Sequence, residues 1–272
     1  TLTSEIQKLV QREIINYSKL KYPLIPKYYG TQNNDLVIEF LNGRTLSNIK
    51  NLNLTVNEKI TIIFEIMVTI GFIHQNHFIY RDLKPNNIII DENKTAVLID
   101  FDRMIEYNDS FSEQIHTVDF SHVYSAPEIT ETNFSYECDI YSIGQMIYFI
   151  MNEKNPKIGN DLNSGDFRSF GDMKEMYINC TKREVNERPI ISELILEFLT
   201  CYHLNIEIQN LYETFCDYFK KTYDDETIEV IKYILNDQDD NTNQRSQDEK
   251  IPKCYMRLVI VFSYMNILMV VI

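Results

Sequence analysis

The chain has 272 residues, 44% of them apolar, so it is long enough to bury one large hydrophobic core or two small ones. Its formal net charge of −14 at pH 7 argues against binding to a nucleic-acid backbone or to an anionic membrane surface. The five cysteines form no C-x-x-C motif and show no zinc spacing, so we expect reduced thiols in a cytoplasmic setting.

The first predicted element is a helix over residues 5–19, with Ser4 as a candidate N-cap. Its apolar residues recur near a helical period: Ile6, Leu9, Val10, Ile14 and Tyr17. A strand that leads into an extended segment is expected at residues 35–41, and residues 57–75 are typical of a helix buried on more than one face.

Two short apolar strands, at residues 88–90 and 96–99, flank the polar turn Asp91-Glu92-Asn93-Lys94 and predict a hairpin. Helices are further expected over residues 134–151, 173–180 and 190–200. Residues 204–235 also have a helical pattern, whereas residues 236–250 are polar and predicted to be disordered. The apolar residues 258–272 would form a helix of roughly 22 Å, short of the roughly 30 Å hydrocarbon core. A tail anchor, a buried strand pair and read-through sequence are the alternatives for them.

The most informative segment is Tyr80-Arg81-Asp82-Leu83-Lys84-Pro85-Asn86-Asn87. In this spacing an Asp can orient an attacking hydroxyl, a Lys two residues later can lie beside a phosphoryl group, and an Asn can hold magnesium. Asp100-Phe101-Asp102 follows the second strand, so the hairpin would bring Asn87 and Asp100 to one side of a metal site.

Three further motifs follow in order: Ala126-Pro127-Glu128, Cys138-Asp139-Ile140-Tyr141-Ser142-Ile143-Gly144 and Glu187-Arg188-Pro189. Together the five motifs resemble the H-R-D-L-x-x-x-N loop, the D-F-G and A-P-E segments, the D-x-W-S-x-G helix and the R-P pair of protein kinases. The chain is identified as a member of the eukaryotic-type Ser/Thr protein kinase superfamily. Small-molecule phosphotransferases share the first two motifs but lack the later ones.

The resemblance implies an α+β, protein-kinase-like fold, mainly the helical C-terminal lobe with a shortened N-terminal lobe. It implies transfer of the γ-phosphoryl group of ATP to Ser or Thr hydroxyls of proteins, with ATP and Mg²⁺ as cofactors. By resemblance, Asp82 is the catalytic base, Lys84 offsets charge on the transferring group, and Asn87 and Asp100 hold magnesium. The presence of Lys84 favours Ser/Thr over Tyr as the acceptor.

The resemblance also assigns residues away from the reacting groups. Glu13 matches the helix Glu that pairs with a strand Lys, Ile38 matches the gatekeeper, and Glu39 to Leu41 match the hinge that binds adenine. Glu128 and Arg188 would form a buried ion pair, and Asp139 would hold the backbone of the catalytic loop. Arg81 could meet a phosphate on the activation segment, for which the candidate sites are Ser110, Ser112 and Thr117.

Several features depart from the family pattern. Asp102 replaces the Gly of D-F-G, no G-x-G occurs among the 7 glycines, and no strand Lys precedes the first helix. Because the chain starts at Thr1, we interpret it as a fragment of a kinase and expect weak or no activity from the chain as written. The alternative is a pseudokinase or scaffold that binds protein partners without chemistry.

The predicted organisation is a kinase domain over residues 1–202, with a remnant small lobe and hinge at 1–41 and the large lobe at 42–202. A helical extension at 203–235, a polar linker at 236–250 and an apolar tail at 251–272 follow. No nucleic-acid partner is expected, and membrane association is a minority interpretation.

Overall fold

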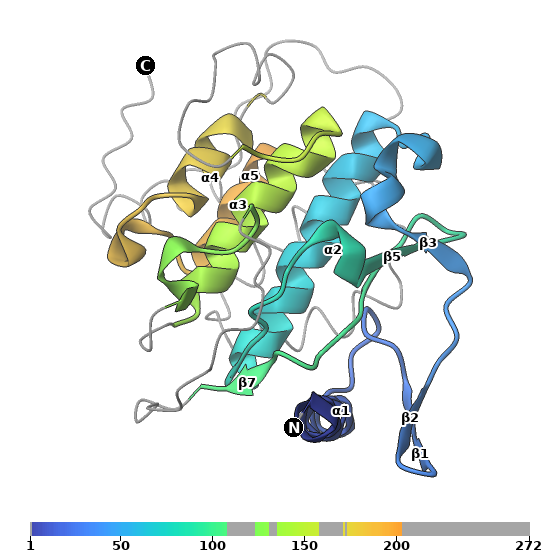
Figure 1. Ribbon diagram of the computed structural model, residues 1–272. Helices are drawn as coiled ribbons and strands as arrows, with labels where there is room; N and C mark the ends of the chain where they lie inside the picture. The colour runs from blue at the N-terminus through green and yellow to red at the C-terminus, as the bar shows by residue number, and fades with distance from the viewer. Residues whose placement is uncertain (1, 108–122, 131–134, 158–170, 172, 203–272) are drawn as a thin grey trace, which may run out of the picture. The chain divides into compact units, whose positions relative to one another are not determined.

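The computed structural model describes residues 2–107, 123–130, 135–157, 171 and 173–202, which are coloured in Figure 1. Residues 1–201 belong to one compact unit. The candidate phosphorylation sites Ser110, Ser112 and Thr117 lie outside the described residues, as do the predicted extension, linker and tail after Tyr202. None of the described helices has both the length and the apolar character needed to cross a bilayer.

Helix α1 (Leu2–Lys19) contacts an antiparallel pair of strands, β1 (Tyr28–Gln32) and β2 (Asp35–Ile38). The helix begins at Leu2, so Ser4 lies inside it and the prediction that Ser4 caps it was wrong. Asn33 and Asn34 join the two strands in left-handed conformations, with φ of 52° and 67°. Asn tolerates such angles better than most residues, which explains this tight turn.

The predicted hairpin is confirmed: β5 (Ile88–Asp91) pairs antiparallel with β6 (Ala96–Leu98), with Ile88 opposite Leu98. The turn between them closes on Asp91, whose Oδ1 accepts hydrogen bonds from the backbone nitrogens of Asn93 and Thr95 at 2.9 and 2.8 Å. Strand β3 (Gly43–Thr45) pairs with the other edge of β5, and β4 (Phe78–Ile79) pairs with β7 (Ile105–Glu106).

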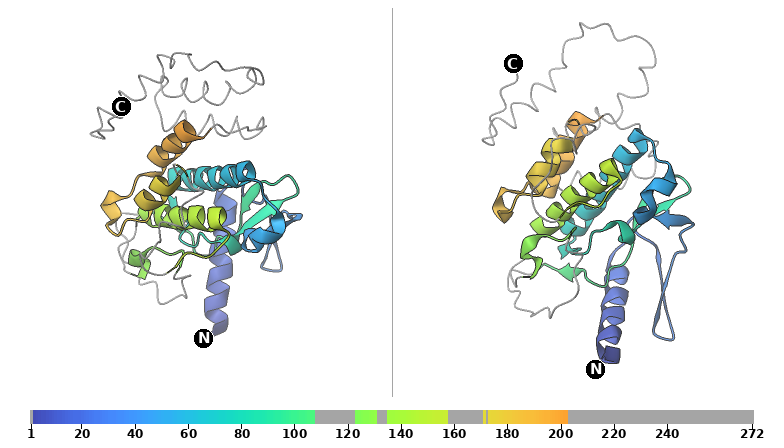
Figure 2. Two further views of the ribbon diagram at one scale, coloured as in Figure 1. Left: turned by 90° about the horizontal axis from the view of Figure 1, so that it is seen from above. Right: turned by 45° about the horizontal axis from the view of Figure 1, so that its top comes forward.

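The larger part of the described unit is helical. Helix α2 (Val56–Gln75) starts with a capping box, in which Glu58 N donates to Thr55 Oγ1 and Thr55 N donates to Glu58 Oε2. It packs against α3 (Glu137–Asn152) and α5 (Ile191–Cys201), and α3 packs against α4 (Met173–Cys180), as Figures 1 and 2 show. The described residues also form short 3₁₀ helices: η1 (Leu46–Leu52), η2 (Pro85–Asn87), η3 (Pro127–Thr130) and η5 (Val185–Glu187).

The bounds of α2, α3 and α5 agree with those of the predicted helices to within a few residues, and the bounds of α4 are the predicted ones. Helix α2 carries buried apolar side chains on several of its faces, and residues such as Ile63, Phe64 and Ile70 are at most 1% exposed. Gly144 lets α3 and α4 approach closely, because a Cβ there would lie 2.6 Å from Thr181 Cγ2. The packed helices therefore support the loops that follow β4 and β6.

Glu65 is a carboxylate buried within this helical part. Glu65 of α2 is 4% exposed, and its Oε2 accepts a hydrogen bond from Ala96 N at 2.7 Å. Burial raises the pKa of Glu65 to about 8, the charge of Asp91 adds to the increase, and the hydrogen bond from Ala96 opposes it. Folding therefore favours the protonated form of this side chain.

The stability of the fold is expected to depend on pH through Glu65. Between pH 4.5 and about 8 the unfolded chain releases this proton while the folded chain retains it, so the free energy of unfolding falls as pH rises through that window. Glu65→Gln should therefore change stability little at acidic pH and raise it by on the order of a few kcal/mol above pH 8. Urea denaturation at the two pH values measures this difference. Glu175→Gln, on the exposed face of α4, is the control, and an equal effect of Glu65→Gln at both pH values would refute the prediction.

Candidate active site

The loop between β4 and β5 is fixed by a single buried carboxylate. Asp139 of α3 is 0% exposed, and its Oδ2 accepts from Tyr80 N at 2.8 Å and lies 2.9 Å from His74 Nε2. Its Oδ1 accepts from Arg81 N at 2.8 Å. Arg81 has a φ of 71°, a conformation that non-glycine residues adopt rarely and keep only where their surroundings hold them. Asp139 thus holds the backbone on which the predicted catalytic residues lie.

Asp82 is the centre of the site. It is 4% exposed, and its Oδ2 accepts hydrogen bonds from Lys84 Nζ at 2.6 Å and from Asn87 Nδ2 at 2.9 Å. Arg103 Nε lies 3.8 Å from the same oxygen, an ion pair beyond hydrogen-bonding distance. The structure therefore brings together Asp82, Lys84 and Asn87, which the sequence predicted, and adds Arg103, which it did not.

The β5–β6 hairpin places Asn87 and Asp100 at the same end. Ile99 N donates to Asn87 O at 2.9 Å. This backbone hydrogen bond brings Asn87 next to Ile99, the residue that precedes Asp100. Tyr80, which replaces the family His, donates its hydroxyl to Ile99 O at 2.7 Å. Asp100 itself has a φ of 65° and begins a turn that Asn16 of α1 contacts.

The donor atoms at this end suit magnesium, which prefers oxygen ligands. The amide nitrogen of Asn87 donates to both Asp82 O and Asp82 Oδ2, so its amide oxygen is the atom that can hold a cation. Next to the Asp100 carboxylate, Asp102 Oδ1 is buried and accepts no hydrogen bond from the described residues. Burial and the charge of Asp100 raise the pKa of Asp102 to about 6. A bound cation would offset this concentration of negative charge.

Glu13 lies against the same acidic group. Burial raises the pKa of Glu13 to about 7, the charges of Asp100 and Asp102 add to the increase, and a hydrogen bond from the backbone of Phe101 opposes it. Within the described part of the chain, Glu13 forms no ion pair with a Lys or Arg. Its neighbours are carboxylates, whereas the family resemblance pairs this Glu with a Lys.

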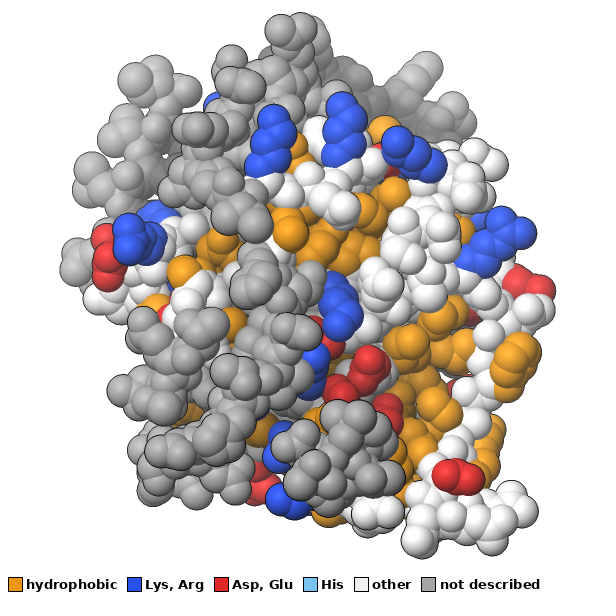
Figure 3. All heavy atoms as spheres, in the orientation of Figure 1, with side chains coloured by type: hydrophobic (Ala, Val, Ile, Leu, Met, Phe, Trp, Pro, Cys, Tyr) orange, Lys and Arg blue, Asp and Glu red, His pale blue; other side chains and the backbone are white. Residues whose placement is uncertain are grey.

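The predicted hinge follows β2. Ile38 ends the strand, and Glu39 N donates to Lys27 O at 2.8 Å, while Lys27 N donates to Glu39 Oε2 at 3.2 Å. Leu41 is half-buried, and the segment leads into β3, which pairs with the strand that follows Asn87. On the face drawn in Figure 3, acidic and basic side chains gather in the middle and are bordered by apolar surface.

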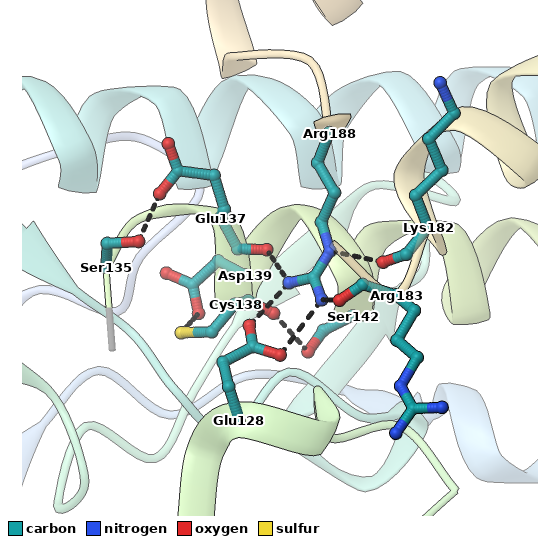
Figure 4. Close-up of polar contacts among 9 residues, drawn as sticks. All are labelled: Glu128, Ser135, Glu137, Cys138, Asp139, Ser142, Lys182, Arg183 and Arg188. Atoms are coloured by element: carbon teal, nitrogen blue, oxygen red, sulfur yellow. Dashed lines mark hydrogen bonds and ion pairs between the residues drawn. The ribbon is translucent and has the colours of Figure 1, made fainter. Parts of the chain in front are cut away.

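Arg188 and Glu128 face each other in a second polar cluster (Figure 4). Nη1 and Nη2 of Arg188 donate to the two carboxylate oxygens of Glu128. The remaining donors reach the backbone oxygens of Lys182, Glu137 and Arg183 at 2.8, 3.0 and 3.3 Å. The guanidinium also lies over the ring of Tyr141, 5.1 Å from its centre. The pair joins η3 to the segment before α5.

Two residues of this region were missed at the level of sequence. Asn16 lies among the apolar positions of α1. Its polar side chain on that face was the one signal in the sequence that could have drawn attention to it. Arg103 directly follows Asp100-Phe101-Asp102, but nothing in the sequence indicates that it turns toward Asp82.

The comparison with known families agrees with this geometry. The sequence profile described as "Protein kinase domain" matches residues 2–241, which is most of the chain. The chain therefore belongs to the protein kinase domain family, with the α+β fold of that family. The match extends beyond residue 202, the predicted end of the kinase domain.

Curated relatives are similar at low identity. A probable serine/threonine-protein kinase of Dictyostelium discoideum is 25% identical over 240 residues, covering 81% of this chain and 38% of that protein. The dual specificity protein kinase zak2 of the same organism is 27% identical over 184 residues, covering 65% and 29%. The serine/threonine-protein kinase nekl-2 of Caenorhabditis elegans is 25% identical over 233 residues, covering 75% and 64%. The chain thus spans less than two thirds of the length of each of these relatives.

Proposed function

We propose that this chain transfers the γ-phosphoryl group of ATP to Ser or Thr hydroxyls of proteins. The convergence of Lys84, Asn87 and Arg103 on the carboxylate of Asp82, next to the hairpin end that carries Asp100, is the observation that supports it. Phosphoryl transfer depends mainly on positioning and on charge stabilisation, and this arrangement supplies both.

In this proposal Asp82 orients the acceptor hydroxyl. The hydroxyl oxygen forms a bond to the γ-phosphorus, the bond from that phosphorus to the bridging oxygen breaks, ADP leaves, and Asp82 accepts the hydroxyl proton. Lys84, held 2.6 Å from Asp82, offsets negative charge on the transferring group. Asn87 and Asp100 would hold magnesium, which when bound neutralises charge on the phosphates.

The adenine of ATP is proposed to bind along the segment after β2. Ile38 would border the base, and the backbone of Glu39 and Leu41 would bond to it. The support is their place in the chain: Ile38 ends β2, and Glu39 and Leu41 lie between β2 and the strand β3 that pairs with β5. Glu13 would face the phosphates from α1.

Regulation by phosphorylation is part of the proposal. Burial lowers the pKa of Arg81 to about 10, and the charges of Arg12 and Arg103 act in the same direction. Arg12 of α1 and Arg103 thus each repel the guanidinium of Arg81, although the charges of Cys138 and Asp139 oppose this, and a phosphate would offset the repulsion. The candidate acceptors are Ser110, Ser112 and Thr117.

The proposed partners are ATP and proteins that carry Ser or Thr acceptors. A cytoplasmic location is proposed because the three cysteines of the described residues, Cys138, Cys180 and Cys201, are all free, as is usual in a reducing compartment.

Binding of ATP with magnesium tests the nucleotide site. The wild-type chain should show a magnesium-dependent rise in thermal stability with ATP, and Asp100→Asn should remove it because a neutral amide holds the cation weakly. A ligand present at about 100 times its Kd stabilises the native state by roughly 2.7 kcal/mol. Asp35→Asn, an exposed position at the start of β2, is the control and should keep the shift.

The outcome separates the two functional classes. A shift that Asp100→Asn abolishes and Asp35→Asn keeps supports a working nucleotide and metal site. No shift in the wild type at millimolar ATP would refute nucleotide binding by this chain and favour a scaffold that binds partners without chemistry.

A further inference from the structure

Three residues on one face of α1 contact the turn formed by residues 100–104. Glu13, Asn16 and Tyr17 are spaced i, i+3 and i+4, so they lie together on the helix surface. Glu13 accepts a hydrogen bond from the backbone of Phe101, and the ring of Tyr17 meets the ring of Phe101 edge-on, with centres 4.9 Å apart. The contact between α1 and this turn is thus both polar and apolar.

Asn16 makes the most direct contact of the three. Its Nδ2 donates to Phe101 O at 2.6 Å and to Met104 O at 2.9 Å, and the side chain is 4% exposed. Because an amide NH₂ has two hydrogens, these two bonds use its whole donor capacity. The two carbonyl groups lie at the two ends of the turn, and Phe101 and Met104 are 0% and 1% exposed.

The 100–104 turn needs such support. Asp100 has a φ of 65°, in the left-handed region, which residues other than glycine adopt rarely. Within the described residues, the backbone hydrogen bond that closes the turn runs from Met104 N to Phe101 O and is 3.3 Å long. Unusual backbone angles persist where surrounding contacts fix them.

We propose that Asn16 is a positioning residue that ties the 100–104 turn to α1 and so sets the orientation of Asp100 toward magnesium. The effect of Asn16 on magnesium rests on the proposed function, whereas its hold on the turn does not. Only a side chain of this length with an NH₂ group satisfies both carbonyls. Leu has a similar shape but removes the donor to Met104 O and leaves Phe101 O with only the 3.3 Å bond from Met104 N, and Asp would place a carboxylate against two carbonyl oxygens.

The hold on the turn is tested without nucleotide. Hydrogen exchange of the full ligand-free chain is measured for wild type, Asn16→Leu and Asn16→Gln. Asn16→Leu should raise exchange roughly tenfold in the peptide that covers residues 101–107 and leave α3 unchanged, because the lost bonds are local. Asn16→Gln retains the amide and should restore part of the protection. The control is Asn76→Leu, whose Nδ2 donates to Phe72 O at 2.8 Å in an exposed helix end.

The effect on magnesium is tested by titrating Mg²⁺ at fixed ATP and following the thermal shift. Asn16→Leu should raise the half-saturating Mg²⁺ concentration roughly tenfold, and Asn76→Leu should not change it. Two results would overturn the proposal: a rise in hydrogen exchange spread over the whole unit, or no rise at residues 101–107. Either would show that Asn16 serves only packing. Faster local exchange with an unchanged half-saturating Mg²⁺ concentration would overturn its magnesium part. Absence of any wild-type shift counts against the proposed kinase function, and the exchange result still decides the role of Asn16.

Discussion

Arg188→Leu is expected to lower the free energy of unfolding by about 3–5 kcal/mol, the cost of leaving one member of a buried ion pair without its partner. Glu128 is 8% exposed, and Arg188 supplies a donor to each of its carboxylate oxygens. The substitution also removes the donors that reach the backbone oxygens of Lys182, Glu137 and Arg183. Urea denaturation of the wild type and of Arg188→Leu at neutral pH measures the difference in the free energy of unfolding.

Two companion variants show where the loss comes from. Arg183→Leu removes an exposed guanidinium from the same segment and should change stability by less than about 0.5 kcal/mol. The double variant Glu128→Leu with Arg188→Leu removes the unpaired charge and should recover part of the loss, but not the part due to the three backbone carbonyls. A loss below 1 kcal/mol for Arg188→Leu alone would contradict the assignment of this pair as a main support of the fold.

The helices and the hairpin could be predicted because their signals are local. The periodicity of residues 57–75, the turn residues between residues 88–90 and 96–99, and the apolar pattern of α4 each lie within one stretch of chain. Short motifs likewise indicated Asp82, Asn87 and Asp100, because the chemistry fixes the spacing of such residues. The prediction that Ser4 caps the first helix was wrong because a helix start depends on backbone angles, which the residue type favours but does not determine.

The remaining contacts join residues far apart in the chain. Asn16 bonds to a backbone 85 residues away, and a polar residue on a mostly apolar helix face gives no indication of its partner. The apolar pattern of residues 57–75 predicts a helix buried on more than one face, but it does not indicate that the charged Glu65 is among the buried side chains. Arg103 faces Asp82 only because the β5–β6 hairpin returns it to the loop before β5. Periodicity shows that a side chain is buried, but tertiary packing decides what it contacts.

Asp82→Asn is expected to lower the rate of phosphoryl transfer by about 10²–10⁴-fold, the usual contribution of a positioned acid or base. Asn has nearly the same size, and its oxygen can still accept from Asn87 Nδ2, which now lies 2.9 Å from Asp82 Oδ2. It cannot accept the proton of the acceptor hydroxyl, and it loses the ion pair with Lys84. The measurement is transfer of labelled γ-phosphate from ATP to a degenerate peptide library with a fixed Ser or Thr.

The size of the loss alone does not distinguish a damaged site from a missing base, so ATP binding is measured on the same samples. Asp82 is not a proposed magnesium ligand, and the magnesium-dependent thermal shift of Asp82→Asn should therefore match that of the wild type. Asp91→Asn is the matched control, because its side-chain oxygen can still accept from Asn93 N and Thr95 N and it lies at the far end of β5. A rate for Asp82→Asn within tenfold of the wild type, with ATP binding intact, would remove Asp82 from the mechanism. A wild-type chain that binds ATP but transfers no phosphate would instead place the whole site in the pseudokinase class.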